Sequence, residues 1–459
     1  MTISPTTATG SAASTELEAL DRRHLIHPHL SADRADRSVI VRGKGCAVWD
    51  AHGTEFLDVT GGGNWLCQIG HGRPEIAEVA AEQAARLGYF TSFYEFTNDR
   101  SIELATRLVD LSPAGFDRVF FTNGGSEGVD SAIKAARLYH HRRGESDRTW
   151  VISRQFAYHG ATYGSGTATG FEHLHVAIGP LLPHIERLTP AWPYHTELYG
   201  GQDPTDFLVA ELEQTIERIG ADKIAAMIGE PVMAGGGVHA PMADYWPRVS
   251  EVLHRHGILL IADEVVTAFG RTGAWFDSPQ RGLSPDIIVT AKGLTSGYAP
   301  LGAVLTRDEV GETLVSAEGF YHGHTYFGHP VACAVGLANL DVLEKEALPG
   351  RAHHIADWLR SGLAPLRDLP AVGDVRVVGA TAGIELVANR ETHEPLMPPV
   401  ARNAVLDLHR NHGVIARDYG NVITLSPPLV IDERQVGRAA AGLTEVLSRM
   451  DTTGRLTPR

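Results

Sequence analysis

The sequence has few cysteines, no excess of basic residues and no long apolar stretch, and each shortage excludes a class of protein. Three cysteines in 459 residues, Cys46, Cys67 and Cys333, fit neither a disulfide framework nor the spacing of a zinc site. No run of eighteen apolar residues is present, so we expect no membrane-spanning helix. With Lys+Arg 40 against Asp+Glu 55, the net charge of −15 argues against a nucleic-acid partner. We therefore expect a cytoplasmic protein that binds no metal, nucleic acid or membrane.

The N-terminal region also lacks the features of a targeting segment. Residues 1–16 are rich in Thr, Ser and Ala, without a basic start or an apolar core, so we expect no signal peptide. We predict that this segment is disordered. Residues 17–75 predict an N-terminal arm with short strands over 38–42, 47–50 and 55–58, which joins a small domain.

The middle of the chain alternates strand and helix patterns. This alternation is typical of βαβ units and predicts a mainly parallel sheet in a large domain over residues 76–345. Residues 346–459 change to helices and short strands, and we assign them to a smaller domain together with the arm. The strands predicted for the large domain are 118–122, 150–153, 225–229, 258–263, 287–290 and 303–306.

A lysine stands at the end of one predicted strand. Residues 287–290 are all β-branched and mostly apolar, and Lys292 follows soon after them and opens a glycine-containing loop. The carboxyl edge of such a sheet is where ligands bind. A desolvated lysine is a usable amine nucleophile, and a Schiff base with pyridoxal phosphate (PLP) is its best-known use. The alternative is a surface lysine that happens to follow a strand.

A glycine turn after strand 118–122 predicts an anion site. Gly125 and Ser126 precede a helical pattern, so their backbone N–H groups and the helix dipole could hold a phosphate. The alternative is an ordinary helix N-cap provided by Ser126. The turn has neither the Gly-Lys-Ser/Thr of a Walker loop nor the G-x-G-x-x-G spacing of a dinucleotide fold.

Two further strand ends carry an aromatic residue and a pair of carboxylates. Tyr158 could stack on a planar ring, or it could be a core tyrosine. Strand 258–263 ends in Asp263-Glu264, and because strand side chains alternate, only one of the two can face the site. An aspartate beside a pyridine nitrogen would keep that nitrogen protonated, and Val265 would face the same side as Asp263. A metal is less favoured, since no histidine lies nearby at ligand spacing.

In order and spacing these residues resemble one family. Lys292, Gly125-Ser126, Tyr158-His159-Gly160, Glu230-Pro231-Val232 and Asp263-Glu264-Val265 resemble the class III aminotransferases, PLP enzymes of fold type I that include ω-amino acid:pyruvate transaminases. The resemblance implies an α/β protein with a mainly parallel seven-stranded sheet flanked by helices, plus a small α+β domain. It also implies that Lys292 forms the Schiff base with PLP and shuttles the proton.

The same resemblance implies roles for the neighbouring residues. Asp263 would pair with the pyridinium, Tyr158 and Val265 would sandwich the ring, and Gly125 and Ser126 would hold the phosphate. His159 and Glu230 would also lie at the cofactor. Thr325 matches a threonine that reaches the phosphate of the neighbouring subunit, which implies a homodimer with shared active sites and leaves a tetramer open. The alternative for Thr325 is a cap of the helix near Pro330.

Substrate contacts follow from the resemblance as well. Arg417 matches an arginine that binds the substrate carboxylate, and Trp65, with Tyr158, matches the lining of the substrate pocket. Asp418 stands where relatives carry proline, so its charge could restrain Arg417. Glu230 matches a glutamate that masks this arginine in some members, and a structural carboxylate below the cofactor is the alternative.

These observations predict a PLP-dependent aminotransferase. It would move an amino group from a primary amine or (ω-)amino acid to a 2-oxo acid such as pyruvate, in a ping-pong reaction through pyridoxamine phosphate. An aminomutase, an epimerase or a decarboxylase would need the same core and stays open, as does a catalytically silent scaffold. A nicotinamide-dependent oxidoreductase is disfavoured, because the glycine fingerprint is missing.

Overall fold

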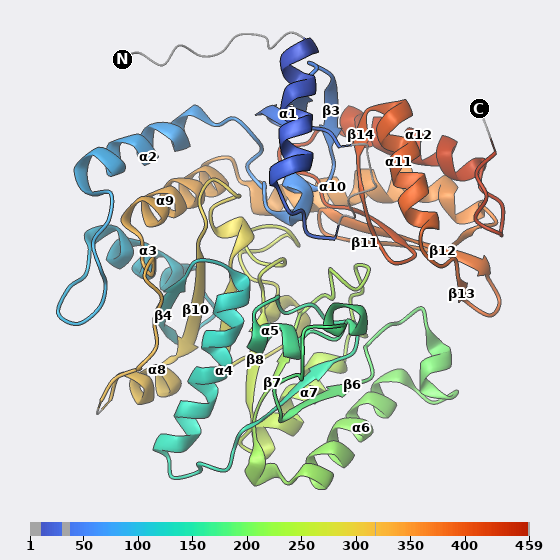
Figure 1. Cartoon of the computed structure of the whole chain (residues 1–459). Coiled ribbons are helices and arrows are strands. Elements are labelled where there is room, and N and C mark those ends of the chain that lie inside the picture. Colours follow the sequence, from blue (N-terminus) through green and yellow to red (C-terminus); the bar gives the residue numbers. More distant parts are fainter. Residues whose placement is uncertain (1–10, 30–36, 317, 458–459) are drawn as a thin grey trace.

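A computed structural model describes residues 11–29, 37–316 and 318–457 of the chain. A large α/β layer structure lies beside a smaller unit built from both ends of the chain (Figure 1). The α-helices are α1 Ser11–His24, α2 Pro74–Leu87, α3 Asp99–Leu111, α4 Gly125–Arg142, α5 Tyr163–Ala168, α6 Pro204–Ile219, α7 Tyr245–Arg255, α8 Asp308–Val315, α9 Pro330–Lys345, α10 Leu348–Leu363, α11 Val400–His412 and α12 Glu433–Ser448.

A sheet of seven strands forms the centre of the large unit. Its order is β4-β10-β9-β8-β7-β5-β6, and β10 alone runs antiparallel to its neighbours in this sheet. The mainly parallel sheet is therefore confirmed. The strands are β4 Phe116–Thr122, β5 Trp150–Arg154, β6 Ile185–Leu188, β7 Ile224–Gly229, β8 Leu259–Asp263, β9 Ile287–Thr290 and β10 Gly302–Arg307.

The six predicted strands of this sheet all form, and sequence reasoning missed the edge strand β6. Its sequence Ile-Glu-Arg-Leu has two charged residues, and only Leu188 is buried. An edge strand pairs on one side alone and needs no continuous apolar run, so the pattern that identifies the central strands is absent from β6.

The central strands bury side chains on both faces of the sheet. Along β8, Leu259 and Ile261 pack in the cluster that contains α4, whereas Leu260 and Ala262 pack in the cluster that contains α6 and α7. This alternation follows from the pleat of a strand. Helices on both faces explain why the strand sequences read as unbroken apolar runs.

The two ends of the chain pair with each other in the smaller unit. Strand β14 (Val414–Ile415) runs parallel to β3 (Glu55–Asp58), with Val414 opposite Leu57. The sheet they share has the order β1-β2-β3-β14, with β1 Ile40–Lys44 and β2 Ala47–Asp50. This pairing supports the proposal that the N-terminal arm and residues 346–459 form one small domain.

A second sheet completes the C-terminal part. Its order is β11-β12-β16-β15, and β13 pairs with β12 off this path. The strands are β11 Val372–Val378, β12 Thr381–Asn389, β13 Glu394–Pro395, β15 Arg417–Tyr419 and β16 Val422–Leu425. The pairing of β15 with β16 places Arg417 opposite Thr424 and so fixes the position of this arginine.

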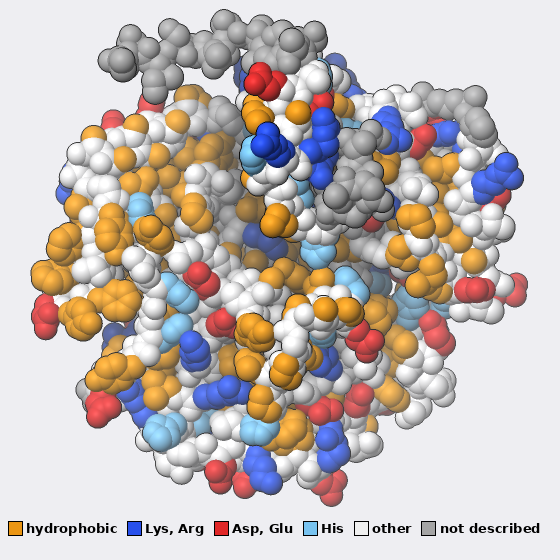
Figure 2. Space-filling view, in the orientation of Figure 1, with side chains coloured by type: hydrophobic (Ala, Val, Ile, Leu, Met, Phe, Trp, Pro, Cys, Tyr) orange, Lys and Arg blue, Asp and Glu red, His pale blue; other side chains and the backbone are white. Residues whose placement is uncertain are grey.

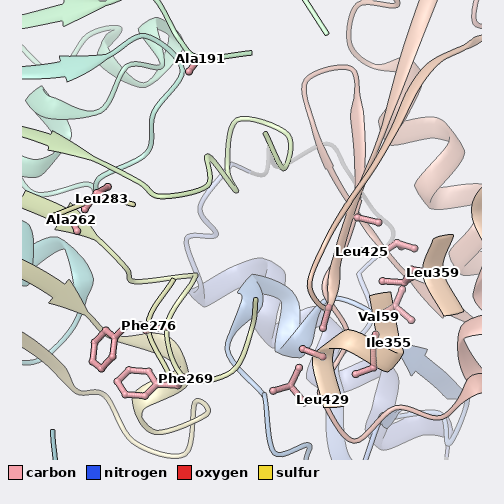
Figure 3. Packing of buried hydrophobic residues seen from close by; sticks show 14 of the residues in the cluster. Val59, Ala191, Ala262, Phe269, Phe276, Leu283, Ile355, Leu359, Leu425 and Leu429 are labelled. Carbon is pink, nitrogen blue, oxygen red and sulfur yellow. The ribbon is translucent and has the colours of Figure 1, made fainter. Parts of the chain in front are cut away.

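One apolar cluster joins the two units. Figure 3 shows Phe269 and Phe276, from the segment after β8, on one side and Leu425, Ile355 and Leu429 on the other. All of them are buried at 4% exposure or less, so β8 and the C-terminal sheet share a continuous core.

The start of the described chain differs from the prediction. Helix α1 begins at Ser11, so the predicted disorder is wrong for residues 11–16, while residues 1–10 lie outside the described part. In α1 the Ser14 hydroxyl donates to the Ala51 carbonyl at 2.6 Å, a tertiary contact that local composition does not reveal. Within the described ranges, no helix is long and apolar enough to cross a membrane.

Candidate active site

Strand β8 sends its last two acidic side chains to opposite faces of the sheet. The Val265 N–H donates to Asp263 Oδ1 at 3.1 Å, and Val265 packs in the α4-side cluster. The buried Glu264 carboxylate faces the other side, where Ser278 donates to it through both its N–H at 2.7 Å and its hydroxyl at 2.6 Å. The two carboxylates therefore lie on opposite faces of the sheet, as the alternation of strand side chains predicts.

A buried histidine holds the Asp263 carboxylate. His159 Nδ1 lies 2.7 Å from Asp263 Oδ2, and both side chains are almost fully buried. Asp263 Oδ1 accepts the Val265 N–H, so both carboxylate oxygens are oriented. The other ring nitrogen, His159 Nε2, is buried and has no protein partner.

Lys292 stands just beyond the next strand, β9. Its φ of 43° lies in the left-handed region, which is uncommon for a residue with a side chain and is typical of functional sites. Burial lowers the pKa of the Lys292 amine, while Asp263 and Glu230 oppose that shift through their charges. A desolvated amine with a lowered pKa has more of the neutral, nucleophilic form. Lys292 is half-buried rather than exposed, which disfavours the surface-lysine alternative.

The N-terminus of α4 has free backbone donors. Its N-cap is Gly124, which makes no side-chain cap hydrogen bond, so the alternative that Ser126 is the N-cap is wrong. The Ser126 hydroxyl instead accepts the Ala161 N–H at 3.1 Å. A side chain at Gly125 would meet the Val265 methyl groups at 3.0 Å, so glycine is needed for this close approach.

Glu230 lies under the loop that carries Tyr158. Its two oxygens accept the Tyr158 N–H at 3.1 Å and the Ala234 N–H at 3.2 Å. Burial raises the pKa of Glu230 to about 7. The Tyr158 side chain is 40% exposed, which excludes the core-tyrosine alternative and leaves the ring open to a ligand.

Arg417 is held by the loop that precedes Trp65. Its Nη1 donates to the Gly63 carbonyl at 2.6 Å and to the Asn64 side chain, and its guanidinium lies 5.2 Å from the Tyr419 ring centroid. Asp418 pairs with Arg402 at 3.2 Å, so the expectation that Asp418 restrains Arg417 is wrong. Strand alternation explains the error, because adjacent residues of β15 face opposite sides.

Trp65 and Tyr419 form a wall beside this arginine. The Trp65 Nε1–H donates to the Tyr419 hydroxyl at 3.0 Å, and Trp65 is buried against Ala234 and Val238. The sequence alone assigns no role to Tyr419 or to Asn64. The Trp65–Tyr419 and Asn64–Arg417 contacts join residues 354 and 353 positions apart, which no local pattern indicates.

Thr325 lies in an exposed loop. Its carbonyl accepts the Tyr89 hydroxyl at 2.7 Å, and the helix that follows is capped by His329, so the alternative of a Thr325 cap is wrong. Apolar side chains gather on this side of the molecule, on the left of Figure 2. The exposed aromatic residues near Thr325 in the chain or in the 88–98 loop are Tyr89, Phe90, Tyr94, Phe96, Tyr321 and Tyr326.

These groups fit PLP chemically. The α4 N-terminus offers uncapped N–H groups to a phosphate, Asp263 offers an oriented buried carboxylate to a cationic ring nitrogen, and Lys292 offers a desolvated amine to an aldehyde. The three come from three different strand ends of one sheet edge, as the sequence analysis predicts.

Comparison with known proteins supports the same conclusion. Residues 30–447 match the class III aminotransferase family. The chain is 36% identical to putrescine–pyruvate aminotransferase of Pseudomonas aeruginosa, over 93% of this chain and 94% of that protein. It is also 36% identical to an omega-aminotransferase of Caulobacter vibrioides, over 86% and 90% of the two chains.

Solved structures agree with these relatives. An (S)-enantioselective omega-transaminase from Thermomicrobium roseum superposes with a TM-score of 0.90 at 41% identity, over 94% of this chain and 97% of that one. An amine transaminase from an uncultivated Pseudomonas species, in its PLP-bound form, gives 0.89 at 38% identity, over 93% and 98%. The sheet edge that carries Lys292, Asp263 and the open N-terminus of α4 is thus part of a PLP-dependent fold, and the chain belongs to the class III aminotransferases of fold type I.

Proposed function

We propose that this aminotransferase moves an amino group from a primary amine or ω-amino acid to a 2-oxo acid such as pyruvate, in a ping-pong reaction. The observation that carries the proposal is the position of the Lys292 amine, whose pKa is influenced by Asp263, Glu230 and Arg417 together. An amine, a carboxylate for the cofactor ring and a cation for the substrate therefore meet at one edge of the sheet. The printed names of the relatives, putrescine–pyruvate and omega-aminotransferases among them, support the same donor and acceptor classes.

Lys292 is proposed as the residue that carries PLP and moves the proton. When bound, PLP supplies an electron sink for the carbon that bears the substrate nitrogen. The lowered pKa of the Lys292 amine favours the neutral form at Nζ, which can accept the proton from that carbon and deliver it two atoms away, to the carbon on the other side of the nitrogen. The same nitrogen would thus serve in both directions of each half-reaction.

The remaining cofactor contacts follow from the fixed geometry. We assign Asp263, oriented by His159, to the ring nitrogen, and Tyr158 and Val265 to the two ring faces. Gly125 and Ser126 would hold the phosphate at the start of α4. Glu230 would tie the Tyr158 loop in place from below, because it accepts N–H groups of that loop and of Ala234.

Arg417 is proposed to bind the carboxylate of the acceptor. A guanidinium binds a carboxylate through two parallel hydrogen bonds. Arg417 already rests on Asn64 and Gly63, so a donor without a carboxylate can bind while the arginine keeps these partners. Trp65 and Tyr419 would line the pocket beside it.

We further propose a homodimer in which Thr325 completes the partner's phosphate site. Thr325 is exposed, and several exposed aromatic rings accompany it. Exposed apolar patches of this kind mark protein interfaces. A tetramer built from such dimers remains compatible with this arrangement.

A half-reaction experiment tests the proposed function. The visible absorption of purified holoenzyme is followed while single amines or amino acids are added, and pyruvate is then supplied. Loss of the absorption band with an ω-amino compound, and its recovery with pyruvate, is the expected result. The Lys292→Ala variant should show no turnover. An absorption band that changes when an amine is added, but is not restored by any oxo acid, would contradict the proposal and favour a mutase, an epimerase or a decarboxylase.

A further inference from the structure

A second cluster of ligating side chains lies between the large unit and the C-terminal sheet. It consists of His195, Glu197 and His393, whose nitrogen and oxygen ligand atoms all lie within 4.8 Å of one another. We call this group the 195–197–393 cluster. None of its residues contacts Lys292, Asp263 or Arg417 among the described interactions, and the proposed reaction makes no use of it.

The distances within the cluster are short. His195 Nδ1 lies 2.7 Å from Glu197 Oε1, and His393 Nδ1 lies 2.9 Å from Glu197 Oε2. Two ligands of one Zn²⁺ ion, each about 2.0–2.1 Å from it, are separated by roughly 3–4 Å. Small side-chain rotations would therefore place an ion among the three atoms.

A buried carboxylate orients one of the histidines. His195 Nε2 lies 2.7 Å from Glu385 Oε1, and the Glu385 side chain is 3% exposed. Arg376 holds the other Glu385 oxygen at 2.5 Å. A carboxylate that accepts the second N–H of a histidine is a common feature of metal sites, because it fixes the ring and leaves the first nitrogen for the ion.

The cluster is also accessible. The side chains of His195, Glu197 and His393 are 12%, 48% and 20% exposed, so an ion can reach them and keep a water ligand. His195 and Glu197 follow β6 of the large sheet, while His393 lies between β12 and β13 of the C-terminal sheet. An ion held by all three would link the two units.

We propose that His195, Glu197 and His393 form a site for a divalent transition-metal ion of the zinc class, with Glu385 as its supporting carboxylate. Two imidazoles and one carboxylate are a donor set that suits Zn²⁺ and its neighbours better than Ca²⁺ or Mg²⁺. The ion displaces the protons that join Glu197 to the two Nδ1 atoms. Both nitrogens of His195 face a carboxylate, so binding at Nδ1 would release a proton from this ring, whereas the free Nε2 of His393 can keep the proton that leaves its Nδ1.

No metal is expected from the sequence, because the ligands of this cluster lie far apart along the chain. His195 and Glu197 are two positions apart in the sequence, but His393 lies 196 residues after Glu197. Short metal motifs depend on neighbouring ligands in the sequence. Here the interface between the two units brings the third ligand into place.

Calorimetric titration of chelator-treated, tag-free holoenzyme with ZnCl₂ tests the proposal. We expect one Zn²⁺ per chain, with proton release that shows as a buffer-dependent heat. His393→Asn should weaken binding at least about tenfold, as loss of a ligand or its support does. Asparagine suits the positive φ of 57° at this position, so the hairpin is preserved. His173→Asn, at an exposed histidine of another turn, should bind Zn²⁺ like the wild type.

Two further readouts make the test independent of activity. Zn²⁺ should raise the unfolding temperature of the wild type clearly more than that of His393→Asn at the same Zn²⁺ concentration, because the stabilisation grows with the ratio of free ion to dissociation constant. Co²⁺ bound at this site should give an absorption spectrum without an intense thiolate band. No binding at millimolar Zn²⁺, equal binding by His393→Asn, or a thiolate band from Cys67 would each overturn the proposal.

Discussion

The two faces of strand β8 at its carboxyl end serve different purposes. Asp263 and Glu264 are neighbours in sequence, carry the same charge and are both buried. Around Glu264 the protein supplies donors from Thr267, Asp277 and Ser278, and each oxygen accepts at least two hydrogen bonds. Around Asp263 it supplies one histidine and one backbone N–H and leaves the rest of the site to a ligand.

This contrast teaches how to separate a structural carboxylate from a functional one. A buried charge is stable only when its partners are present, so a fully satisfied group has no capacity for a ligand. On the Asp263 side, the buried His159 Nε2 has no protein partner, and the start of α4 has no side-chain cap. Unused hydrogen-bonding capacity collects where we propose that the cofactor binds.

The largest expected effect is on catalysis, at Asp263. Asp263→Asn keeps the shape but removes the charge that would pair with the cofactor ring. Removing one partner of a buried charge pair costs about 3–5 kcal/mol, which corresponds to a rate loss of roughly 10²–10⁴-fold. Steady-state rates of the variant, with its PLP content measured by absorption, check this outcome. A near-normal rate would show that Asp263 does not serve the cofactor.

Glu264→Ala should act on stability instead. It leaves buried donors of Thr267, Asp277 and Ser278 without an acceptor, and each unsatisfied group costs about 1–3 kcal/mol. We expect unfolding at clearly lower denaturant concentration and a nearly unchanged turnover per folded, PLP-loaded chain. If the turnover of a folded Glu264→Ala variant fell as far as that of Asp263→Asn, Glu264 would not be a purely structural carboxylate.

The burial of the Glu230 carboxylate should make the stability of the protein depend on pH. Its pKa is raised from 4.5 to about 7, a difference equivalent to about 3 kcal/mol. Below about pH 4.5 the carboxyl is protonated in both the folded and the unfolded protein, so its burial does not lower the stability. Between about pH 4.5 and 7 the unfolded protein loses the proton while the folded protein keeps it, so the free energy of unfolding falls as the pH rises.

Glu230→Gln should remove that pH dependence. The stability of the wild type relative to the variant is expected to fall between pH 4.5 and 7, measured by denaturant unfolding of both proteins after removal of PLP. Groups common to both proteins cancel in this difference. A constant difference over the whole range would mean that Glu230 ionises normally in the folded protein.

The smallest effect concerns the substrate rather than the cofactor. Arg417→Ala should slow the half-reaction of pyruvate by roughly 10–100-fold, since hydrogen bonds to charged groups contribute about 1.5–3 kcal/mol. Simple amines should react at nearly the wild-type rate. Arg402→Ala is the matched control, because Arg402 pairs with Asp418 outside this contact. Equal losses for both substrate classes would identify Arg417 as a structural residue.

Features that depend on residues close together in the sequence were predictable, and features that depend on contacts between distant parts of the chain were not. Central strands such as β8 and β9 were predictable, because burial on both faces requires a continuous apolar run. Edge strand β6 and helix α1 were not, since their stability comes from partners elsewhere in the chain. The pairing of β14 with β3 joins segments from opposite ends of the sequence and has no local signal.

The sequence by itself determined the chemistry at the sheet edge. Asp263 ends strand β8, and Lys292, Gly125 and Tyr158 each stand a few residues beyond a strand, so strand polarity alone brings their positions to one side. Only the tertiary structure decided which groups these residues meet. It paired Asp418 with Arg402, seated Arg417 on Asn64, and placed His393 against Glu197. The physical reason is that side-chain contacts depend on which surfaces pack together, whereas the periodicity of a strand is set by neighbours along the chain.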